Sequence, residues 1–408
     1  MMSHFTNSDA QNGEIDARSM EKLNVDFAQT VNADDTEVRD VEIYMKSDKD
    51  KATDFANYFC SYAFLYHQKQ MLTDHRRMEA YHSAVTDNAS VFQGKVVLDV
   101  GTGSGVLAVW SAQAGARKVY AVEYTEMAKH AQHLVKANGV EDVVEVLQSS
   151  VEELDLPEKV DIIISEWMGY FLLRESMLDS VLKARDKFLN PGGYMFPSHA
   201  TMYWAPITNE RERLSRQQEY CTTMQDWFSF KEETNNKYNL NMECLEHQFE
   251  QEQRHYYVTT SGWSELWPET VVGTPFVVKE IDLLTCTQPE IAGVDEIPFE
   301  CPIVTSGPCR VSGFAGWFTT DFKGNCTSML PTPVVLSTAP DNGYTHWGQQ
   351  AFYLHLPLDC LPGDIVKGTF KMVRQRDNIR LYNIHLKHTV KRSNGAEEPL
   401  VYNKYEMP

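Results

Sequence analysis

An alternation of short apolar segments with helical segments between Lys95 and Leu189 constrains the fold more than any other feature of this sequence. Four segments have the length and composition of buried strands: KVVLDV (95–100), KVYAVE (118–123), VVEVLQ (143–148) and VDIIIS (160–165). The segments 106–115, 127–139 and 176–189 are typical of helices, and Asn190-Pro191-Gly192-Gly193 ends the last one. This order predicts an α/β fold in which a mostly parallel sheet has helices on both faces.

The composition changes after Pro197, and the remaining segments predict an all-β second domain, either a barrel or a sandwich. The strand-like runs are 200–207, 276–284, 310–322, 351–358, 365–376 and 379–390. A charged, aromatic and helical insertion over about 208–265 interrupts it. We therefore expect a disordered acidic tail over 1–38, an α/β domain over 39–197 and a β domain over 198–408. The α/β domain is expected to begin with one or two helices over Asp54–Val85.

Charge and cysteine content limit the environment and the partners. The 408 residues include 37 Lys and Arg against 57 Asp and Glu, a net charge of −20, which favours basic partners over direct contact with nucleic acid or anionic membranes, and also favours solubility. The eight cysteines lack zinc-like spacing, so we expect no metal site, and free thiols in the cytoplasm or nucleus. We expect no signal peptide, and no apolar run approaches the roughly 20 residues that span a membrane.

A glycine-rich turn, VVLDVGTGSG (96–105), joins the first predicted strand to a helix. Gly101, Gly103 and Gly105 permit a tight turn and close approach of a ligand. Glu123, at the end of the next strand, could accept hydrogen bonds from both hydroxyls of a ribose. The GxGxG spacing differs from the dinucleotide fingerprint, and a P-loop lysine is missing from the motif. The motif predicts a nucleoside site that suits S-adenosylmethionine better than NAD; a turn without a ligand and a merely solvated Glu123 are the alternatives.

The segment SEWMGYFLLRESM (165–177) places two carboxylates among apolar side chains. On a continuous helix or strand, Glu166 and Glu175 would point in opposite directions, so they converge only if the chain folds back, which Gly169 would allow. Two neighbouring carboxylates require a cation to stay ionised. A planar guanidinium fits better than Mg²⁺, which would need more oxygen ligands. The alternative is a pair of separate, salt-bridged glutamates.

This segment resembles the double-glutamate loop of protein arginine N-methyltransferases, and the resemblance covers nearly the whole chain after about residue 50. It includes the glycine-rich turn, YFxxY (58–62), MLxDxxR (71–77) and YTHW (344–347). YFCSYAFLYHQKQML and LLRES look most like the plant branch of the type I enzymes. The resemblance implies a Rossmann-like class I methyltransferase domain followed by a β-barrel, with the insertion at 208–265 as a dimerisation arm of a homodimer.

The resemblance also implies roles for cofactor-binding residues. Arg77 would pair with the carboxylate of S-adenosylmethionine, Glu123 with its ribose and Glu152 with its adenine amine. The other residues expected to line the cofactor are Gly101, Gly103, Met71 and Tyr62. Many members carry a histidine three residues before this methionine, where the present chain has Gln68 next to His67. Glutamine can still bond a ribose or carboxylate, so we expect cofactor binding to persist.

The resemblance assigns the substrate arginine to Glu166 and Glu175. Its pocket would be shaped by Tyr58, Tyr62, Met71, Met177 and Trp347. His346 and Asp74 would form a proton-accepting pair, and a methionine at position 71 fits asymmetric dimethylation. The proton leaves readily after transfer, so we expect His346 mainly to orient the pocket. Core packing is the alternative for the methionines and tyrosines, and a structural role is the alternative for His346.

Two rival classes of function are less consistent with these residues. The GxGxG spacing and the absence of a proton-relay Tyr-x-x-x-Lys argue against an NAD-linked oxidoreductase. A non-catalytic scaffold with a methyltransferase fold would have no reason to retain Glu166, Glu175, Arg77 and Glu123 together. We therefore expect an enzyme that transfers methyl groups from S-adenosylmethionine to protein arginines, leaving S-adenosylhomocysteine. Its expected substrates are Arg-rich proteins, such as histone tails or Gly/Arg-rich proteins.

Overall fold

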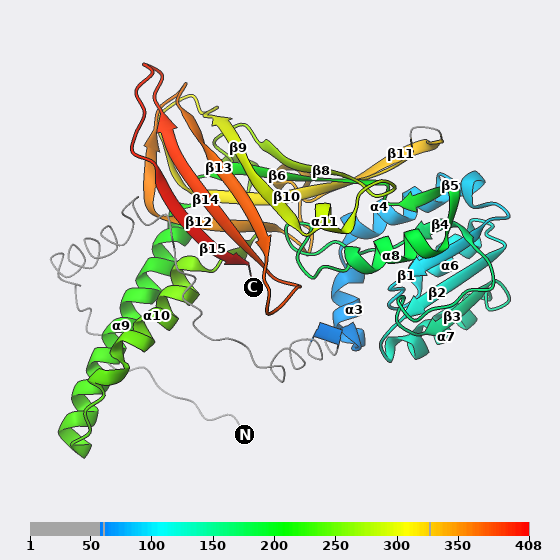
Figure 1. Ribbon diagram of the computed structural model, residues 1–408, viewed down its shortest axis with the longest axis horizontal. Coiled ribbons are helices and arrows are strands. Elements are labelled where there is room, and N and C mark those ends of the chain that lie inside the picture. Colours follow the sequence, from blue (N-terminus) through cyan, green and yellow to red (C-terminus); the bar gives the residue numbers. More distant parts are fainter. Residues whose placement is uncertain (1–57, 60–61, 326–327, 408) are drawn as a thin grey trace. The chain divides into compact units, whose positions relative to one another are not determined.

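The computed structural model describes residues 58–59, 62–325 and 328–407 (Figure 1), so the tail predicted over 1–38 lies outside the described residues. A five-stranded sheet has the order β3-β2-β1-β4-β5, and all neighbouring strands are parallel. Its strands are β1 (Val96–Val100), β2 (Lys118–Glu123), β3 (Val144–Gln148), β4 (Val160–Ile164) and β5 (Leu189–Phe196). The strand order reverses between β1 and β4, and such a switch point is where open α/β sheets bind ligands.

Helices precede and connect these strands. They are α3 (Leu65–Leu72), α4 (His75–Thr86), α5 (Ala89–Phe92), α6 (Val106–Gln113), α7 (Met127–Ala137) and α8 (Leu178–Phe188). In the described part of the predicted Asp54–Val85 helical region, α3 and α4 are separate helices. The break falls at Asp74, because its side chain accepts a hydrogen bond from the N–H of Arg77 and so caps α4.

The second domain is a β-barrel built from antiparallel sheets, as the family resemblance predicts. One sheet has the order β7-β12-β10-β6-β8, with β11 paired to β10, and the other has the order β15-β14-β13-β9. The strands are β6 (His199–Ile207), β7 (Gly262–Ser264), β8 (Phe276–Asp282), β9 (Gly293–Pro302), β10 (Cys309–Gly324), β11 (Met329–Ser337), β12 (Gln349–Cys360), β13 (Ile365–Arg374), β14 (Tyr382–Lys391) and β15 (Val401–Met407). A short helix, α11 (Gln288–Ile291), precedes β9.

The double-glutamate loop is anchored in the aromatic core of the barrel. Phe171, at the tip of this loop, is 3% exposed. Its ring centroid lies 6.1–6.2 Å from those of Trp204, Phe352 and Phe370. Gly316 on β10 leaves room for it, because a Cβ atom there would lie 2.5 Å from the Phe171 ring. The barrel therefore fixes a loop that belongs to the first domain.

Several strands were missed by the sequence analysis. The segment Asn190–Gly193 was interpreted only as a helix stop, but it lies within β5, whose pairing with β4 shifts register between Val160 and Ile162. The ladder resumes at Tyr194, so proline and glycines form an irregularity inside a strand. The strands β7, β9, β11 and β15 were also not predicted, because their sequences are short or contain many polar residues and prolines.

The insertion predicted over 208–265 is helical, with α9 (Glu210–Tyr238), α10 (Glu246–Arg254) and a π-helical turn (His255–Thr259). The long helix α9 and the shorter α10 pack on one another, and the rings of Trp227 and Phe249 stack with centroids 4.2 Å apart. The last residues of the predicted range are not part of the helical insertion, because they form β7, which pairs with β12 in the barrel. Within the part of the chain that the structure describes, no helix has the length and apolar character needed to cross a membrane.

Candidate active site

The glycine-rich turn follows β1 and adopts backbone conformations that favour glycine. Gly101, Gly103 and Gly105 have φ values of 71°, 55° and 93°. A Cβ atom on Gly101 would lie 2.3 Å from Cε of Met177, and one on Gly103 would lie 2.9 Å from Oε1 of Gln68. The side chains of Met177 and Gln68 therefore lie directly against the turn, in space that only glycine leaves open.

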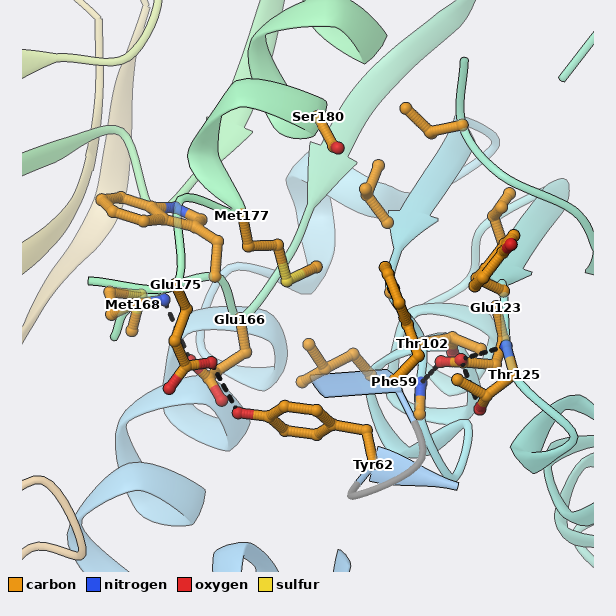
Figure 2. A pocket seen from close by; sticks show the side chains of 18 of the residues that line it. Phe59, Tyr62, Thr102, Glu123, Thr125, Glu166, Met168, Glu175, Met177 and Ser180 are labelled. Carbon is orange, nitrogen blue, oxygen red and sulfur yellow. Dashed lines mark hydrogen bonds between the residues drawn. The ribbon is translucent and has the colours of Figure 1, made fainter. Parts of the chain in front are cut away.

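Glu123 ends β2 and holds this turn in place (Figure 2). One carboxylate oxygen accepts a hydrogen bond from the N–H of Gly103 at 3.0 Å, and the other accepts from the N–H and hydroxyl of Thr125 at 2.8 and 2.7 Å. Burial raises the pKa of nearby Asp99 to about 7, against the hydrogen bond from Thr102, which lowers it. Asp99 thus supports the turn from beneath, a role that the sequence analysis did not predict.

Gln68 and Glu152 line the same cavity. Gln68 is buried, and its amide donates to the carbonyl oxygen of Tyr62 at 3.3 Å. Glu152 accepts hydrogen bonds from Ser180 and Lys183 at 2.9 and 3.2 Å. Burial would raise the pKa of Glu152, but these bonds outweigh it and lower the pKa. Glu152 is therefore held ionised as an acceptor at the cavity wall.

The double-glutamate loop follows β4 and folds back on itself, as predicted. Gly169 and Leu172 form an antiparallel bridge, and the N–H of Gly169 donates to the oxygen of Leu172 at 2.9 Å. A Cβ atom on Gly169 would lie 1.8 Å from the carbonyl oxygen of Arg174, so only glycine fits there. The fold-back brings Glu166 and Glu175 to one cavity wall, where burial and, to a smaller extent, the charge of Glu166 raise the pKa of Glu175 (Figure 2).

Arg77 forms an ion pair with Glu166. Its Nε and Nη2 atoms donate to Oε2 of Glu166 at 3.0 and 2.9 Å, and the N–H of Met168 donates to the other oxygen at 3.3 Å. The sequence analysis placed Arg77 at the cofactor carboxylate. In the structure Arg77 lines the same cavity as the glycine-rich turn and bonds to Glu166, the residue predicted to grip the substrate arginine.

Glu175 is held by a tyrosine and an arginine. Tyr62 donates a hydrogen bond to Oε2 of Glu175 at 2.6 Å, and Nη1 of Arg174 lies 3.6 Å from Oε1. The ring of Tyr58 packs against that of Tyr62 with centroids 5.1 Å apart. Burial raises the pKa of Glu175, whereas the Tyr62 hydrogen bond and the Arg174 charge lower it. An added cation beside Glu175 would favour its ionised form further.

Asp74 and His346 form the predicted pair. Asp74 accepts hydrogen bonds from Nδ1 and the N–H of His346 at 2.7 and 2.8 Å. Burial would raise the pKa of Asp74, but its bonds to His346 and Arg77 lower it below the ordinary value. The rings of Trp347 and His346 pack with centroids 3.9 Å apart, and the indole N–H of Trp347 donates to the carbonyl oxygen of Met168 at 2.8 Å. This cluster therefore joins α4, the double-glutamate loop and the barrel.

Two cavities meet at the double-glutamate loop. The first, of about 580 Å³, is lined by the glycine-rich turn and by Gln68, Arg77, Glu123, Glu152 and Met177. The second, of about 650 Å³, is lined by His346, Trp347, Tyr344, Arg174 and Asn378. Their shared lining residues are Tyr58, Tyr62, Met71, Glu166, Met168, Glu175 and Arg380. The structure thus brings every predicted site residue except Asp74 to these cavities, and Asp74 lies behind His346.

Sequence reasoning missed Arg380, Asn378 and Arg174 as site residues. Arg174 stands next to Glu175 in the quoted loop, so its charge was a usable signal. Arg380 and Asn378 belong to the turn between β13 and β14, about 200 positions further along the chain, and nothing in that segment indicated a contact with the site. Among the described residues no group of three or more His, Cys, Asp or Glu could hold a metal ion.

The parallel sheet, the glycine-rich turn and the acid at the end of β2 define a methyltransferase of the Rossmann-like class joined to a β-barrel. The family model for the arginine methyltransferase oligomerization subdomain matches residues 198–394, and that for ribosomal protein L11 methyltransferase (PrmA) matches residues 76–235. A curated relative, protein arginine N-methyltransferase PRMT10 of Oryza sativa subsp. japonica, is 52% identical over 356 residues, covering 87% of this chain and 93% of the relative. This chain belongs to the protein arginine N-methyltransferase family.

Other relatives and solved structures agree. Protein arginine N-methyltransferase PRMT10 of Arabidopsis thaliana is 49% identical over 348 residues, covering 85% of this chain and 90% of the relative. The crystal structure of Arabidopsis thaliana protein arginine methyltransferase 10 matches with a TM-score of 0.84 and 46% identity, covering 86% of this chain and all of that one. The Trypanosoma brucei PRMT1 enzyme–prozyme complex with AdoHcy has a TM-score of 0.70 and 31% identity, covering 85% of this chain and 100% of that one. The predicted family, its likeness to plant members, the fold class and S-adenosylmethionine as cofactor are confirmed.

Proposed function

We propose that this enzyme methylates arginines in Arg-rich protein segments and produces monomethylarginine and asymmetric dimethylarginine. The observation that carries the proposal is the meeting of two cavities at Glu166 and Glu175. One cavity has the lining expected for a nucleoside cofactor, and the other opens to a cation-binding wall of carboxylates and aromatic rings. A substrate guanidinium bound there would lie next to the cofactor cavity.

The residues of the first cavity fit S-adenosylmethionine. Gly101 and Gly103 line this cavity without a Cβ atom, Glu123 presents a carboxylate at the end of β2, and Arg77 supplies a cation. Bonds from Ser180 and Lys183 hold Glu152 ionised, as an acceptor for an amine. When bound, S-adenosylmethionine supplies a methyl group activated by a sulfonium.

The chain's own residues offset the main electrostatic obstacle. Both reactants are cationic, so their approach in a site of low dielectric constant is repulsive. Arg77 already compensates the charge of Glu166, whereas Glu175 faces Tyr62 and the more distant Arg174. A guanidinium held between these unequal carboxylates concentrates its positive charge toward one side. The nitrogen on the other side is then the better nucleophile, and holding it in line supplies much of the rate.

The pair of Asp74 and His346 lies beside the acceptor cavity, where the methylated nitrogen releases its proton. His346 is anchored through both its ring and its backbone, and Trp347 covers one side of it. This anchoring supports an orienting role for His346. Met71 and Met177 narrow the site, and we propose that their size admits a second methyl group on the same nitrogen.

The experiment that tests the proposal uses methyl-labelled S-adenosylmethionine and an Arg-rich peptide, with Glu166→Gln as the paired variant. Hydrolysis of the product should yield asymmetric dimethylarginine from the wild type and little from Glu166→Gln. Symmetric dimethylarginine or monomethylarginine alone would refute the type I product. A protein that binds the cofactor but labels no arginine would refute the proposed activity.

We also propose that the enzyme is a homodimer that acts in the cytoplasm or nucleus. The matched oligomerization subdomain and the apolar side chains exposed on the helical insertion support dimerisation; these side chains are Leu214, Phe228, Phe230, Tyr238, Leu240 and Leu245. The six described cysteines are free thiols, which supports a reducing compartment. Light scattering would measure the mass in solution, and a fluorescent fusion would locate the protein in cells.

A further inference from the structure

The turn between β13 and β14, residues 375–381, belongs to the barrel but bonds directly to the double-glutamate loop. The N–H of Glu175 donates to the carbonyl oxygen of Arg380 at 2.8 Å, and Nη1 of Arg380 donates back to the carbonyl oxygen of Glu175 at 2.6 Å. The hydroxyl of Ser176 donates to the carbonyl oxygen of Ile379 at 2.6 Å. Three hydrogen bonds therefore join segments separated by about 200 positions in the chain.

The turn itself is well fixed. The N–H of Gln375 donates to the carbonyl oxygen of Leu381 at 2.9 Å, and the side chain of Asn378 accepts from the N–H of Arg380 at 3.1 Å. Arg380 is thus presented from a closed turn at the end of two barrel strands. A rigid support of this kind can hold another residue in place.

Glu175 requires such support because its backbone conformation is unfavourable. Its φ angle is 76°, and that of the following Ser176 is 54°, a region that residues other than glycine seldom adopt. The backbone angles of Glu175 set the direction in which its side chain leaves the chain. Because Arg380 bonds both the N–H and the C=O of Glu175, it stabilises this direction.

Arg380 also supports the aromatic side of the site. Its guanidinium carbon lies 3.8 Å from the ring centroid of Tyr58 and 5.1 Å from that of Phe59. Tyr58 packs against Tyr62, whose hydroxyl bonds the carboxylate of Glu175. Arg380 therefore reaches Glu175 by two routes, through the main chain and through the tyrosine wall.

We propose that Arg380 is a positioning residue for Glu175, supplied to the acceptor site by the β-barrel. This inference rests on the proposed function, in which Glu175 grips the substrate guanidinium. An arginine suits the position because its planar guanidinium stacks on a ring and donates a directed hydrogen bond at the same time. A lysine would keep the charge and a donor but lose the planar stacking.

The test is a double-mutant cycle on substrate binding. Isothermal titration would measure the dissociation constant of an Arg-containing peptide for the complex with S-adenosylhomocysteine, which needs no turnover. Arg380→Ala should weaken binding by ~10-fold, the effect of about one lost charged hydrogen bond, and Arg380→Lys should fall between it and the wild type. In a Glu175→Gln background, Arg380→Ala should change binding less than about twofold, since coupled residues are not additive.

Controls separate positioning from general damage. Arg376→Ala removes an exposed arginine from the same turn and should leave peptide binding and kcat/KM unchanged. The affinity for the cofactor should stay within about twofold in all Arg380 variants, because the position acts through Glu175. If Arg380→Ala does not fold, Arg380→Lys in both backgrounds serves the same cycle.

Two results would overturn the inference. If Arg380→Ala weakened peptide binding by the same factor in the wild-type and Glu175→Gln backgrounds, Arg380 would act independently of Glu175. Unchanged binding in Arg380→Ala and Arg380→Lys would show that it has no role. A wild-type enzyme that neither binds nor methylates the peptide would instead refute the proposed function, and with it this inference.

Discussion

Replacement of Asp74 by alanine should be among the most damaging single changes outside the barrel core. Asp74 is 1% exposed and accepts hydrogen bonds from the N–H of Arg77 at 3.0 Å and from two nitrogens of His346 at 2.8 and 2.7 Å. Loss of a helix N-cap costs about 1 kcal/mol, and a hydrogen bond to a charged group contributes about 1.5–3 kcal/mol. Because the N–H of His346 also loses its acceptor, the total is about 3–5 kcal/mol.

Thermal unfolding followed by calorimetry measures this loss. Each kcal/mol lowers Tm by about 2–4 °C in a domain of 150–250 residues, so Asp74→Ala should lower Tm by at least about 6 °C. The matched control is Asp87→Ala, an exposed aspartate at the other end of the same helix α4. A negative charge there opposes the helix dipole, so its removal should be neutral or slightly stabilising. A Tm for Asp74→Ala within about 2 °C of that for Asp87→Ala would refute the reasoning.

The same variant has a defined pH dependence. The pKa of Asp74 is lowered in the folded protein, because its hydrogen bonds from His346 and Arg77 outweigh the burial that would raise it. Its stabilising effect is therefore complete above the unfolded pKa of about 3.9 and is lost as the pH falls through the folded pKa. The Tm difference between wild type and Asp74→Ala should stay constant from about pH 5 to 7 and shrink below about pH 4. A difference that grew in acid would contradict this assignment.

Three further predictions concern activity. In a peptide methylation assay His346→Gln should retain most of kcat, because glutamine can still donate to Asp74 and the pocket keeps its shape. A loss of kcat as large as that caused by Glu166→Gln would contradict this. Arg174→Ala should move the acidic limb of the pH profile of kcat/KM to higher pH, because burial raises the pKa of Glu175 and the Arg174 charge lowers it. Activity needs ionised Glu175 and is lost as the pH falls through that pKa. An acidic limb at the same pH in the variant would therefore count against the ion pair. Gly101→Ala should weaken cofactor binding by ~10-fold or more, since its Cβ would meet Met177 at 2.3 Å and its φ is 71°.

Gly94→Ala provides a matched control for the last prediction. Gly94 has a φ of 70°, nearly that of Gly101, but a Cβ atom there would meet nothing within 4 Å. Both variants carry a similar backbone strain, so equal Tm losses with unequal cofactor affinity would isolate the effect of the Gly101 substitution on the cofactor site. Equal cofactor affinity in the two variants would refute a ligand-binding role for Gly101.

Much of the first domain could be predicted because its signals are local. The strands β1, β2, β3 and β4 and the helices α6, α7 and α8 agree with their predicted ranges to within about two residues, since buried parallel strands are short apolar runs between helical segments. Strand β5 was missed because its Pro-Gly-Gly segment is typical of a turn, and only pairing with β4 restores it to the sheet. Polar strands such as β9 and β15 carry little period-two signal, so their existence depends on their neighbours.

The features of the candidate site also divide into local ones, which the sequence predicts, and long-range contacts, which it does not. The glycine-rich turn and the fold-back at Gly169 follow from residues a few positions apart, and the structure shows both. The ion pair of Arg77 with Glu166 and the support of Glu175 by Arg380 join residues 89 and 205 positions apart. No local pattern records such contacts, because they depend on how the helices and the barrel pack against the sheet.

The sequence by itself determined the order of strands and helices, the glycine-rich turn after β1 and the presence of two carboxylates after β4. These features depend on backbone preferences and on hydrophobic patterns that act over a few residues. Only the tertiary structure decided which cations and hydroxyls surround each carboxylate, and therefore that Glu166 is paired with Arg77 while Glu175 lies between Tyr62, Arg174 and the Arg380 turn. The physical reason is that side-chain ionisation and orientation are set by contacts across the packed domains, which chain neighbours alone do not specify.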